Sequence, residues 1–357
     1  MMSNAAADTV KIGLTVPLTG VQAGLGKEAE AVWRAFAKHA NSTSLVRGHT
    51  LEVVVLDDGF DPARTKGNAE LLAQQGVAVM AGTAGIPNVL AMVPVLEKYR
   101  IPLLGPASGS LALRGKSESV FHVKASFGTE VDKMARLLST MGLRRVTLVL
   151  DDVADRRPLA DRFAAELTRS SGGVSQVVAT VVQAQKGGKV DATAASVLAD
   201  KPDAIYVMTI PGLAGGVLKE IHSKGFRGFT AAWALTATDS VVKELGAAGA
   251  GIIFGAVMPS PTSDAPGIKA SFQSFAKKQG ITPSFRAMEI YVAGRILAEA
   301  LVRRSDNSPV NGTKVSAALA SLRDVSIDGW HVGYGPSDRE ASHFVDTVML
   351  LNDGRFR

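Results

Sequence analysis

Two pairs of adjacent aspartates are the side chains best suited to acid–base catalysis or metal binding. Asp57-Asp58 and Asp151-Asp152 each end a predicted strand, and paired carboxylates serve as general acid and base or as ligands of a hard cation. Neighbouring side chains at a strand end point in opposite directions, however, so the two carboxylates of a pair diverge. No histidine follows at ligand spacing, and no H-E-x-x-H occurs. The sequence therefore favours neither a catalytic nor a metal centre at these pairs.

Nucleophilic and phosphate-binding motifs are not found either. The chain has no cysteine, which excludes a thiol nucleophile, a thiolate zinc site and disulfides, and no G-x-S-x-G surrounds Ser108 or Ser126. The glycine-rich segment 17–27 approaches a phosphate loop, but Gly20 and Gly26 are one residue too far apart. We therefore predict that the protein is not an enzyme and needs no cofactor.

Three strand-to-helix turns carry the features of an anion site. They span residues 17–22, 83–88 and 105–110, and each contains glycine together with threonine or serine. Unpaired backbone N–H groups and a hydroxyl at a helix start attract negative charge. Because the carboxyl ends of neighbouring parallel strands lie at one edge of a sheet, we expect the three turns to converge. They predict the binding of a carboxylate or a similar group.

Short aliphatic strands alternate with amphipathic helices along the chain, which is typical of parallel βαβ units. Residues 10–16 form the first predicted strand, and residues 27–40 follow as a helix whose apolar side chains recur at helical spacing. Asp61-Pro62 is a predicted helix start, with Asp as the cap and Pro at the first position. A second series of the same alternation begins near residue 129. The pattern predicts two doubly wound α/β lobes of similar size.

The length and composition of the chain are those of a two-domain globular protein. It has 357 residues, of which 46% are hydrophobic, more than one core usually serves. The formal charge is +6, but the basic residues are scattered and aromatics make up 6%, so no nucleic-acid partner is expected. The longest apolar run, residues 247–259, is too short to cross a bilayer. Residues 1–9 lack signal-peptide features and are expected to be disordered or an artificial start left after removal of a signal peptide.

Six groups of residues, spread in order over nearly the whole chain, carry a family resemblance. They are LDDGFDP at 56–62, IPLLGPASG at 101–109, VFHVKASF at 120–127 with Glu130, KELG at 243–246, PSF at 283–285 with EIY at 289–291, and GPSDR at 335–339 with FV at 344–345. In this order they resemble the substrate-binding proteins of branched-chain amino-acid ABC transporters. The resemblance implies the type I periplasmic binding protein fold: an α/β protein with two doubly wound parallel-sheet lobes joined by three crossovers.

The resemblance also implies where the lobes begin and end. Lobe one, which anchors the ligand carboxylate, would comprise residues 10–124 plus 258–328. Lobe two, which closes on the ligand, would comprise residues 125–257 plus 329–357. The crossovers are expected near residues 124–127, 255–259 and 329–334.

In lobe one, the resemblance assigns the ligand carboxylate to two loops. Ala84, Gly85 and Ile86 match the family's second loop, and Ala107 and Ser108 match the third, where a hydroxyl and backbone N–H groups hold the carboxylate. The first loop is expected to close over the ligand. Its two candidate residues are Thr19 and Gln22.

In lobe two, the sequence departs from the family at the positions that contact an amino acid. Family members present aromatic residues after two strands and an acid after the next one for the ligand amine, whereas this chain has Ala154, Pro211 and roughly Leu235 there. The nearest acids are Asp152 and Asp239. Three aromatic residues are expected to supply apolar walls: Phe127, Trp233 and Tyr291.

The resemblance implies a monomeric periplasmic receptor of an ABC importer, with a membrane permease as its partner. The ligand would be a small carboxylate: a branched-chain or another apolar or aromatic amino acid, or an aromatic or keto acid without an amine. Two rivals stay open. An enzyme on the same scaffold would need Asp57-Asp58 or Asp151-Asp152 to be catalytic. A cytoplasmic sensor would lack a signal peptide at the native gene start.

Overall fold

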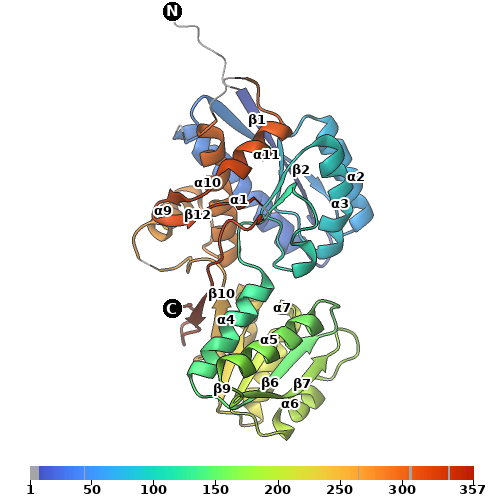
Figure 1. Cartoon of the computed structure of the whole chain (residues 1–357), viewed down its shortest axis with the longest axis vertical. Helices are drawn as coiled ribbons and strands as arrows, with labels where there is room; N and C mark the ends of the chain where they lie inside the picture. Colours follow the sequence, from blue (N-terminus) through green and yellow to red (C-terminus); the bar gives the residue numbers. More distant parts are fainter. Residues whose placement is uncertain (1–7, 44, 264, 305–307, 337) are drawn as a thin grey trace, which may run out of the picture. The chain divides into compact units, whose positions relative to one another are not determined.

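The computed structural model describes residues 8–43, 45–263, 265–304, 308–336 and 338–357. The chain forms two compact units, and the backbone passes between them three times. Unit 1 comprises Met1–Ala125 and Asp264–His343, and unit 2 comprises Ser126–Ser263 and Phe344–Arg357. Each unit has its own mostly parallel sheet with helices packed on it (Figure 1). The α/β class and the parallel-sheet lobes predicted from the sequence are confirmed.

The strands and helices have the following bounds. The strands are β1 (Asp8–Val16), β2 (His49–Asp57), β3 (Val79–Ala81), β4 (Leu103–Leu104), β5 (Val120–Phe121), β6 (Arg145–Asp151), β7 (Gln176–Gln183), β8 (Ala204–Met208), β9 (Phe229–Ala232), β10 (Ile253–Ala256), β11 (Val325–Ile327), β12 (Trp330–Val332) and β13 (Asp346–Met349). The α-helices are α1 (Ala23–Ser42), α2 (Pro62–Gln74), α3 (Ile86–Tyr99), α4 (Phe127–Thr140), α5 (Arg156–Ser170), α6 (Val190–Ala199), α7 (Pro211–Ser223), α8 (Asp239–Leu245), α9 (Ile268–Gln279), α10 (Phe285–Val302) and α11 (Gly312–Ser321).

Unit 1 is built on a parallel sheet of order β2-β1-β3-β4-β5. Helix α1 packs against α10, and α10 against α11, on one face, whereas α2 packs against α3 on the other (Figure 1). The strand order reverses between β1 and β3. In open parallel sheets, ligands bind outside the carboxyl ends of the strands at such a reversal. The topology therefore predicts a ligand site at the loops after β1 and β3.

Local sequence explains how the helices next to these loops begin. The Asp61 carboxylate accepts a hydrogen bond from the Arg64 N–H at 2.9 Å and Pro62 opens α2, which confirms the predicted helix start. Helix α3 begins differently, because its N-cap is Gly85, at φ +90°, and no side chain caps it. The first N–H groups of a helix have no intrahelical acceptor. Helix α3 therefore presents uncapped donors at the end of β3.

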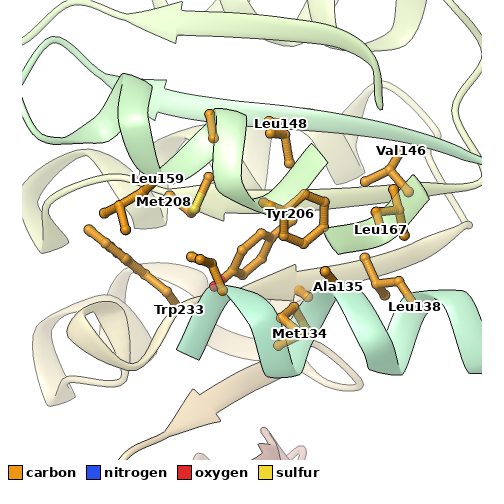
Figure 2. Packing of buried hydrophobic residues seen from close by; sticks show 14 of the residues in the cluster. Met134, Ala135, Leu138, Val146, Leu148, Leu159, Leu167, Tyr206, Met208 and Trp233 are labelled. Atoms are coloured by element: carbon orange, nitrogen blue, oxygen red, sulfur yellow. The ribbon is translucent and has the colours of Figure 1, made fainter. Parts of the chain in front are cut away.

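Unit 2 contains a sheet of order β13-β10-β9-β8-β6-β7, in which β13 is antiparallel to β10 and the other pairings are parallel. Every residue of β8 is buried, as expected for a central strand covered on both faces. Side chains from α4, β6 and β8 pack around Tyr206 in the core, with Trp233 at its edge (Figure 2). This core supports the loops at the carboxyl ends of β6, β8 and β9.

The unit boundaries differ from the sequence expectation at two segments. Residues 258–263 lie in unit 2, and residues 329–343 lie in unit 1. In addition, Ala125, expected to begin lobe two, is the last residue of the first segment of unit 1. The second difference has a clear cause, because His122 forms a β-bridge with Glu340 and ties this late segment to the end of β5. Such a pairing joins segments far apart in the sequence, so the motif spacing does not reveal it.

The N-terminal expectation needs a correction at its last two residues. Asp8 and Thr9 belong to β1, where they pair with His49 and Thr50 of β2. Residues 1–7 lie outside the described residues. No helix in the described ranges is both long and apolar enough to span a bilayer.

Candidate functional site

Asp57, at the end of β2, fixes the loop that follows β1. Its carboxylate accepts hydrogen bonds from the Leu18 N–H at 2.8 Å, the Thr19 N–H at 3.3 Å and the Thr19 hydroxyl at 2.6 Å. The Thr19 hydroxyl, followed by the Leu18 amide, lowers the pKa of Asp57 below its usual range. Thr19, expected to close over a ligand, therefore donates its hydroxyl proton to Asp57 instead.

Asp58 is fully buried and has partners other than those of Asp57. It accepts hydrogen bonds from the Phe60 N–H at 2.8 Å, the Thr65 hydroxyl at 3.1 Å and the Thr15 hydroxyl at 3.3 Å. Burial raises the pKa of Asp58. The two aspartates thus contact separate partners, as predicted for adjacent residues at a strand end. Within the described ranges, no group of three or more His, Cys, Asp or Glu side chains could hold a metal ion.

The loop after β4 offers fewer donors than the sequence suggested. The Ala107 N–H donates to the Thr83 carbonyl at 2.8 Å, and the Ser108 N–H donates to the Pro106 carbonyl at 2.7 Å. Both amides, expected to hold a carboxylate, are therefore used within unit 1. The Ser108 oxygen accepts from the Ser110 N–H at 3.2 Å, but the Ser108 hydroxyl proton has no acceptor in the described part of the chain. This hydroxyl is the donor that the loop retains.

The backbone amides in the turn from β3 into α3 are not used in hydrogen bonds among the described residues. The amides of Ala84, Gly85 and Ile86 donate no hydrogen bond to any residue that the structure describes. Ala84 is buried, whereas Gly85 and Ile86 are partly exposed. A helix N-terminus also carries partial positive charge. We call these three amides the α3 amide site; together with the Ser108 hydroxyl on the adjoining loop, they are the donors best able to hold a carboxylate.

Arg286, which the motifs did not indicate, contacts this turn and shares its carboxylate partner with Lys124. Arg286 Nη2 donates to the Gly82 carbonyl at 3.0 Å, and Arg286 Nη1 lies 3.5 Å from Glu289 Oε2. Lys124 Nζ lies 2.9 Å from the same Glu289 oxygen. One buried carboxylate, Glu289, therefore pairs with two cations. Only the folded chain brings Lys124 to α10, so the motif pattern gave no signal for this cluster.

Gln22 lies at the same edge of the sheet. It is the N-cap residue of α1, it is exposed, and its side chain makes no capping hydrogen bond. Because β1 pairs directly with β3, the Gln22 loop adjoins the loop that carries the α3 amide site. Its role as a ligand contact stays a prediction.

In unit 2, a buried ionic cluster joins the carboxyl ends of β6, β8 and β9. Arg156 Nε lies 2.9 Å from Asp151 Oδ1, and the guanidinium carbon lies 4.3 Å from the Trp233 ring centroid. Asp151 Oδ2 accepts from the Ile210 N–H at 2.6 Å, and Trp233 Nε1 donates to the Thr209 carbonyl at 2.7 Å. Burial raises the pKa of Asp151, and Arg156 opposes that rise. We call Asp151, Arg156 and Trp233 the unit 2 cluster; the sequence analysis did not detect Arg156.

Most of the unit 2 residues predicted to contact a ligand are buried in the core or hydrogen-bonded within the protein. Trp233 is fully buried and Phe127 is 7% exposed, with 4.6 Å between their ring centroids. Asp152 is exposed, and its hydrogen bond from Gln185 Nε2 at 2.9 Å lowers its pKa. Pro211 is partly exposed at the first position of α7. The two aromatic rings thus belong to the core and not to an exposed wall.

Tyr291 likewise belongs to the core of unit 1. It is 2% exposed, and its ring centroid lies 4.9 Å from that of Phe275, 5.6 Å from Phe272 and 6.1 Å from Phe36. Its hydroxyl accepts from Arg295 Nη1 at 2.9 Å. The expected wall is corrected to a packing role, because α1 and α9 contribute the aromatic rings around this α10 side chain.

An acid does reach the loop after β9, but it comes from α4. Glu130, 1% exposed, accepts from the Ala234 N–H at 2.5 Å. Leu235 is partly buried beside it, and Asp239 is exposed in the first turn of α8. Glu130 therefore supports the backbone of the loop where the family resemblance led us to expect an acid for a ligand amine.

Comparisons with known proteins show which sequences and folds the chain is similar to. A family model described as periplasmic binding protein matches residues 9–352. The Leu/Ile/Val-binding protein homolog 6 of Brucella abortus is 32% identical over 181 residues. That alignment covers 49% of this chain and 45% of the relative, so the match spans about half of the curated protein's length.

Two solved structures show the same fold over nearly the whole chain. One is the branched-chain amino acid transporter substrate binding protein from Streptococcus pneumoniae in complex with isoleucine, which is 19% identical, with a TM-score of 0.83 and 98% of each chain covered. The other is the solute binding protein of an ABC transporter from R. palustris in complex with 4-hydroxybenzoate. It is 20% identical, with a TM-score of 0.83, and the match covers 98% of this chain and 95% of that one.

Proposed function

The chain belongs to the periplasmic binding protein family, and on this premise we propose that it is an extracytoplasmic receptor of an ABC importer. It binds a small molecule through a carboxylate and presents that molecule to a membrane permease. Unit 1 anchors the carboxylate, and unit 2 closes on the ligand by a hinge motion. Receptors of this kind bind without catalysis, which agrees with the divergent orientation of Asp57 and Asp58.

The observation that carries the proposal is the α3 amide site. Three consecutive amides without acceptors among the described residues, at an uncapped helix N-terminus, form a site for a negatively charged group. The Ser108 hydroxyl on the next loop supplies one further donor. Arg286 and Lys124 add positive potential nearby. Gln22, on the adjoining loop, is the polar side chain that we propose closes over the ligand.

Two classes of carboxylate fit this anchor. One is an apolar or aromatic amino acid, as in the relative that binds isoleucine. The other is an acid without an amine, as in the relative that binds 4-hydroxybenzoate. Unit 2 favours the second class, because Asp152 is already bonded to Gln185 and Glu130 supports a loop backbone. An ammonium buried without an acidic partner is costly.

Before the costs of ordering and closure, the donors and the buried ligand surface reach the range of micromolar binding. Micromolar binding requires about 8 kcal/mol. Two or three hydrogen bonds to a charged group contribute about 1.5 to 3 kcal/mol each, and burial of roughly 100 Å² of apolar ligand surface adds about 2.5 kcal/mol. Ordering and closure costs are subtracted from this sum.

Titration calorimetry against leucine, isoleucine, valine, phenylpyruvate and 4-hydroxybenzoate tests the proposal. We expect at least one carboxylate to bind, and Ser108→Ala to weaken that binding by about tenfold or more, because a hydrogen bond to a charged group is lost. Ser326→Ala is the matched control, since Ser326 is an exposed serine on β11 of the same unit. Binding of a phosphorylated compound, with no carboxylate bound, would overturn the proposal.

A further inference from the structure

Phe60 is the most exposed aromatic side chain of the protein. The chain has 13 phenylalanines, four tyrosines and three tryptophans, and all of them lie in the described ranges. Phe60 is 38% exposed, whereas every other aromatic residue is buried or partly buried. Twelve of the other rings are buried and seven are partly exposed, so Phe60 is the aromatic ring most open to solvent.

The exposed ring lies against the α3 amide site. The turn that carries Phe60 follows β2, and Gly85 follows β3. A Cβ atom placed on Gly85 would lie 3.0 Å from Phe60 Cζ and 3.1 Å from Phe60 Cε2. Because β1 lies between β2 and β3 in the sheet, the side chain extends past the carboxyl end of β1 to reach this position. The ring therefore flanks the strand reversal at which ligands bind in such sheets.

The backbone holds Phe60 in an unfavourable conformation. Its φ angle is +64°, a region that bulky side chains rarely occupy. The Phe60 N–H donates to the buried carboxylate of Asp58 at 2.8 Å, and the Asp61 N–H donates to the Asp58 carbonyl at 2.9 Å. Glycine would fit this turn better. The turn itself therefore gives no reason for a phenyl ring at this position.

We propose that Phe60 is a ligand-contact residue that selects carboxylates with an apolar group next to the carboxylate. The inference rests on the proposed function, because it places the ligand carboxylate on the amides of Ala84, Gly85 and Ile86. A carboxylate held there brings its next carbon atoms within van der Waals reach of the ring that touches Gly85. Aromatic ligands gain further from offset or edge-to-face ring contacts. Phe60 thereby favours aryl and branched alkyl acids over polar ones.

The test compares Phe60→Gly with Arg100→Gly. Arg100 is an exposed residue at φ +54° that caps the other end of α3, so this control relieves the same kind of backbone strain far from the α3 amide site. Both variants are expected to fold with thermal stability equal to or above that of the unchanged protein. Calorimetry uses 4-hydroxybenzoate and isoleucine as probes. Phe60→Gly should weaken binding about tenfold, since roughly 60 Å² of covered ring corresponds to one decade of affinity; Arg100→Gly should leave it unchanged.

A conservative variant distinguishes the loss of a ring–ligand contact from a change in the structure of the loop. Phe60→Trp should restore affinity, and its indole emission should shift when 4-hydroxybenzoate or isoleucine is added. The unchanged protein gives the background emission, because Trp33 and Trp233 are buried and Trp330, on β12, is partly exposed. Unchanged affinity in Phe60→Gly, with affinity lost in Ser108→Ala, overturns this inference and leaves the proposed function standing. A protein that binds none of the carboxylates overturns both.

Discussion

The carboxyl edges of the two sheets use acidic side chains in opposite ways. In unit 1, Asp57 and Asp58 bind loop amides and threonine hydroxyls, and the N-terminus of α3 stays uncapped. In unit 2, Arg156 forms an ion pair with Asp151. The other Asp151 oxygen accepts a hydrogen bond from the Ile210 N–H, at the start of α7. At the unit 1 edge, the amides of Ala84, Gly85 and Ile86 have no acceptor among the described residues, whereas the Ile210 amide at the unit 2 edge donates to Asp151. Because α7 also begins without a side-chain cap, the two edges differ in whether the amides at the helix start already have an acceptor, and not in capping or in the number of polar residues nearby.

The largest effect is expected from breaking the unit 2 cluster. Arg156→Met leaves the buried Asp151 carboxylate without its cationic partner, which should lower the free energy of unfolding by about 3–5 kcal/mol. Chemical denaturation measures this loss. Arg157→Met is the matched control, because Arg157 is the next residue and its side chain is 69% exposed. A loss below about 1 kcal/mol would mean that the cluster does not hold the unit 2 loops.

The pH dependence of stability should differ in sign between Asp57 and Asp58. Hydrogen bonds lower the pKa of Asp57, so its contribution is present above the unfolded pKa of about 4 and is lost as pH falls. Burial raises the pKa of Asp58, so the native state holds that proton more tightly, and the contribution is lost as pH rises through the raised pKa. One proton gives a limiting slope of about 1.4 kcal/mol per pH unit.

Urea denaturation of Asp57→Asn and Asp58→Asn from pH 3 to pH 7 tests this difference. Relative to Asp57→Asn, the unchanged protein should gain stability as pH rises; relative to Asp58→Asn, it should lose stability. Each variant serves as the control of the other, because the substitutions are chemically identical and occupy adjacent positions. Slopes of the same sign would contradict the assignment of separate surroundings to the two carboxylates.

The sequence predicted what depends on local chemistry. The apolar spacing of residues 27–40 identified α1, whose buried residues include Trp33 and Phe36, and Asp61-Pro62 identified the start of α2. The three turns were recognised because glycine and hydroxyl residues at strand ends are typical of helix starts. Divergence of Asp57 and Asp58 followed from the alternation of side chains along a strand.

The rest could not be predicted because it depends on contacts between distant segments. The Ala107 amide is used by the Thr83 carbonyl, a bond between loops that no motif encodes. Arg156 and Trp233 meet only when the β6 and β9 loops lie at one edge. In the sequence, Phe60 stood out only as part of LDDGFDP at 56–62, a segment that resembles the family. Its exposure and its proximity to Gly85 depend on the folded structure.

A smaller effect is expected from Thr19→Val on the loop after β1. The substitution removes the hydroxyl that donates to Asp57 at 2.6 Å, and the exposure of this pair limits the loss to about 0.5–1 kcal/mol. A double-mutant cycle with Asp57→Asn should return most of that value as coupling energy. Ligand affinity should change less than threefold, because the Thr19 proton is not offered to a ligand. Additive effects would show that the hydroxyl does not order the loop.

The smallest effect on stability is expected from Gln22→Ala on the same loop. Gln22 is exposed and makes no capping bond, so the free energy of unfolding should change by less than about 0.5 kcal/mol. Affinity should nevertheless fall by about threefold if its side chain closes over the ligand. Thr19→Val is then the matched comparison, since one variant affects stability and the other affects binding. Equal losses of affinity in both would indicate that loop order, and not the Gln22 side chain, governs closure at the edge of unit 1.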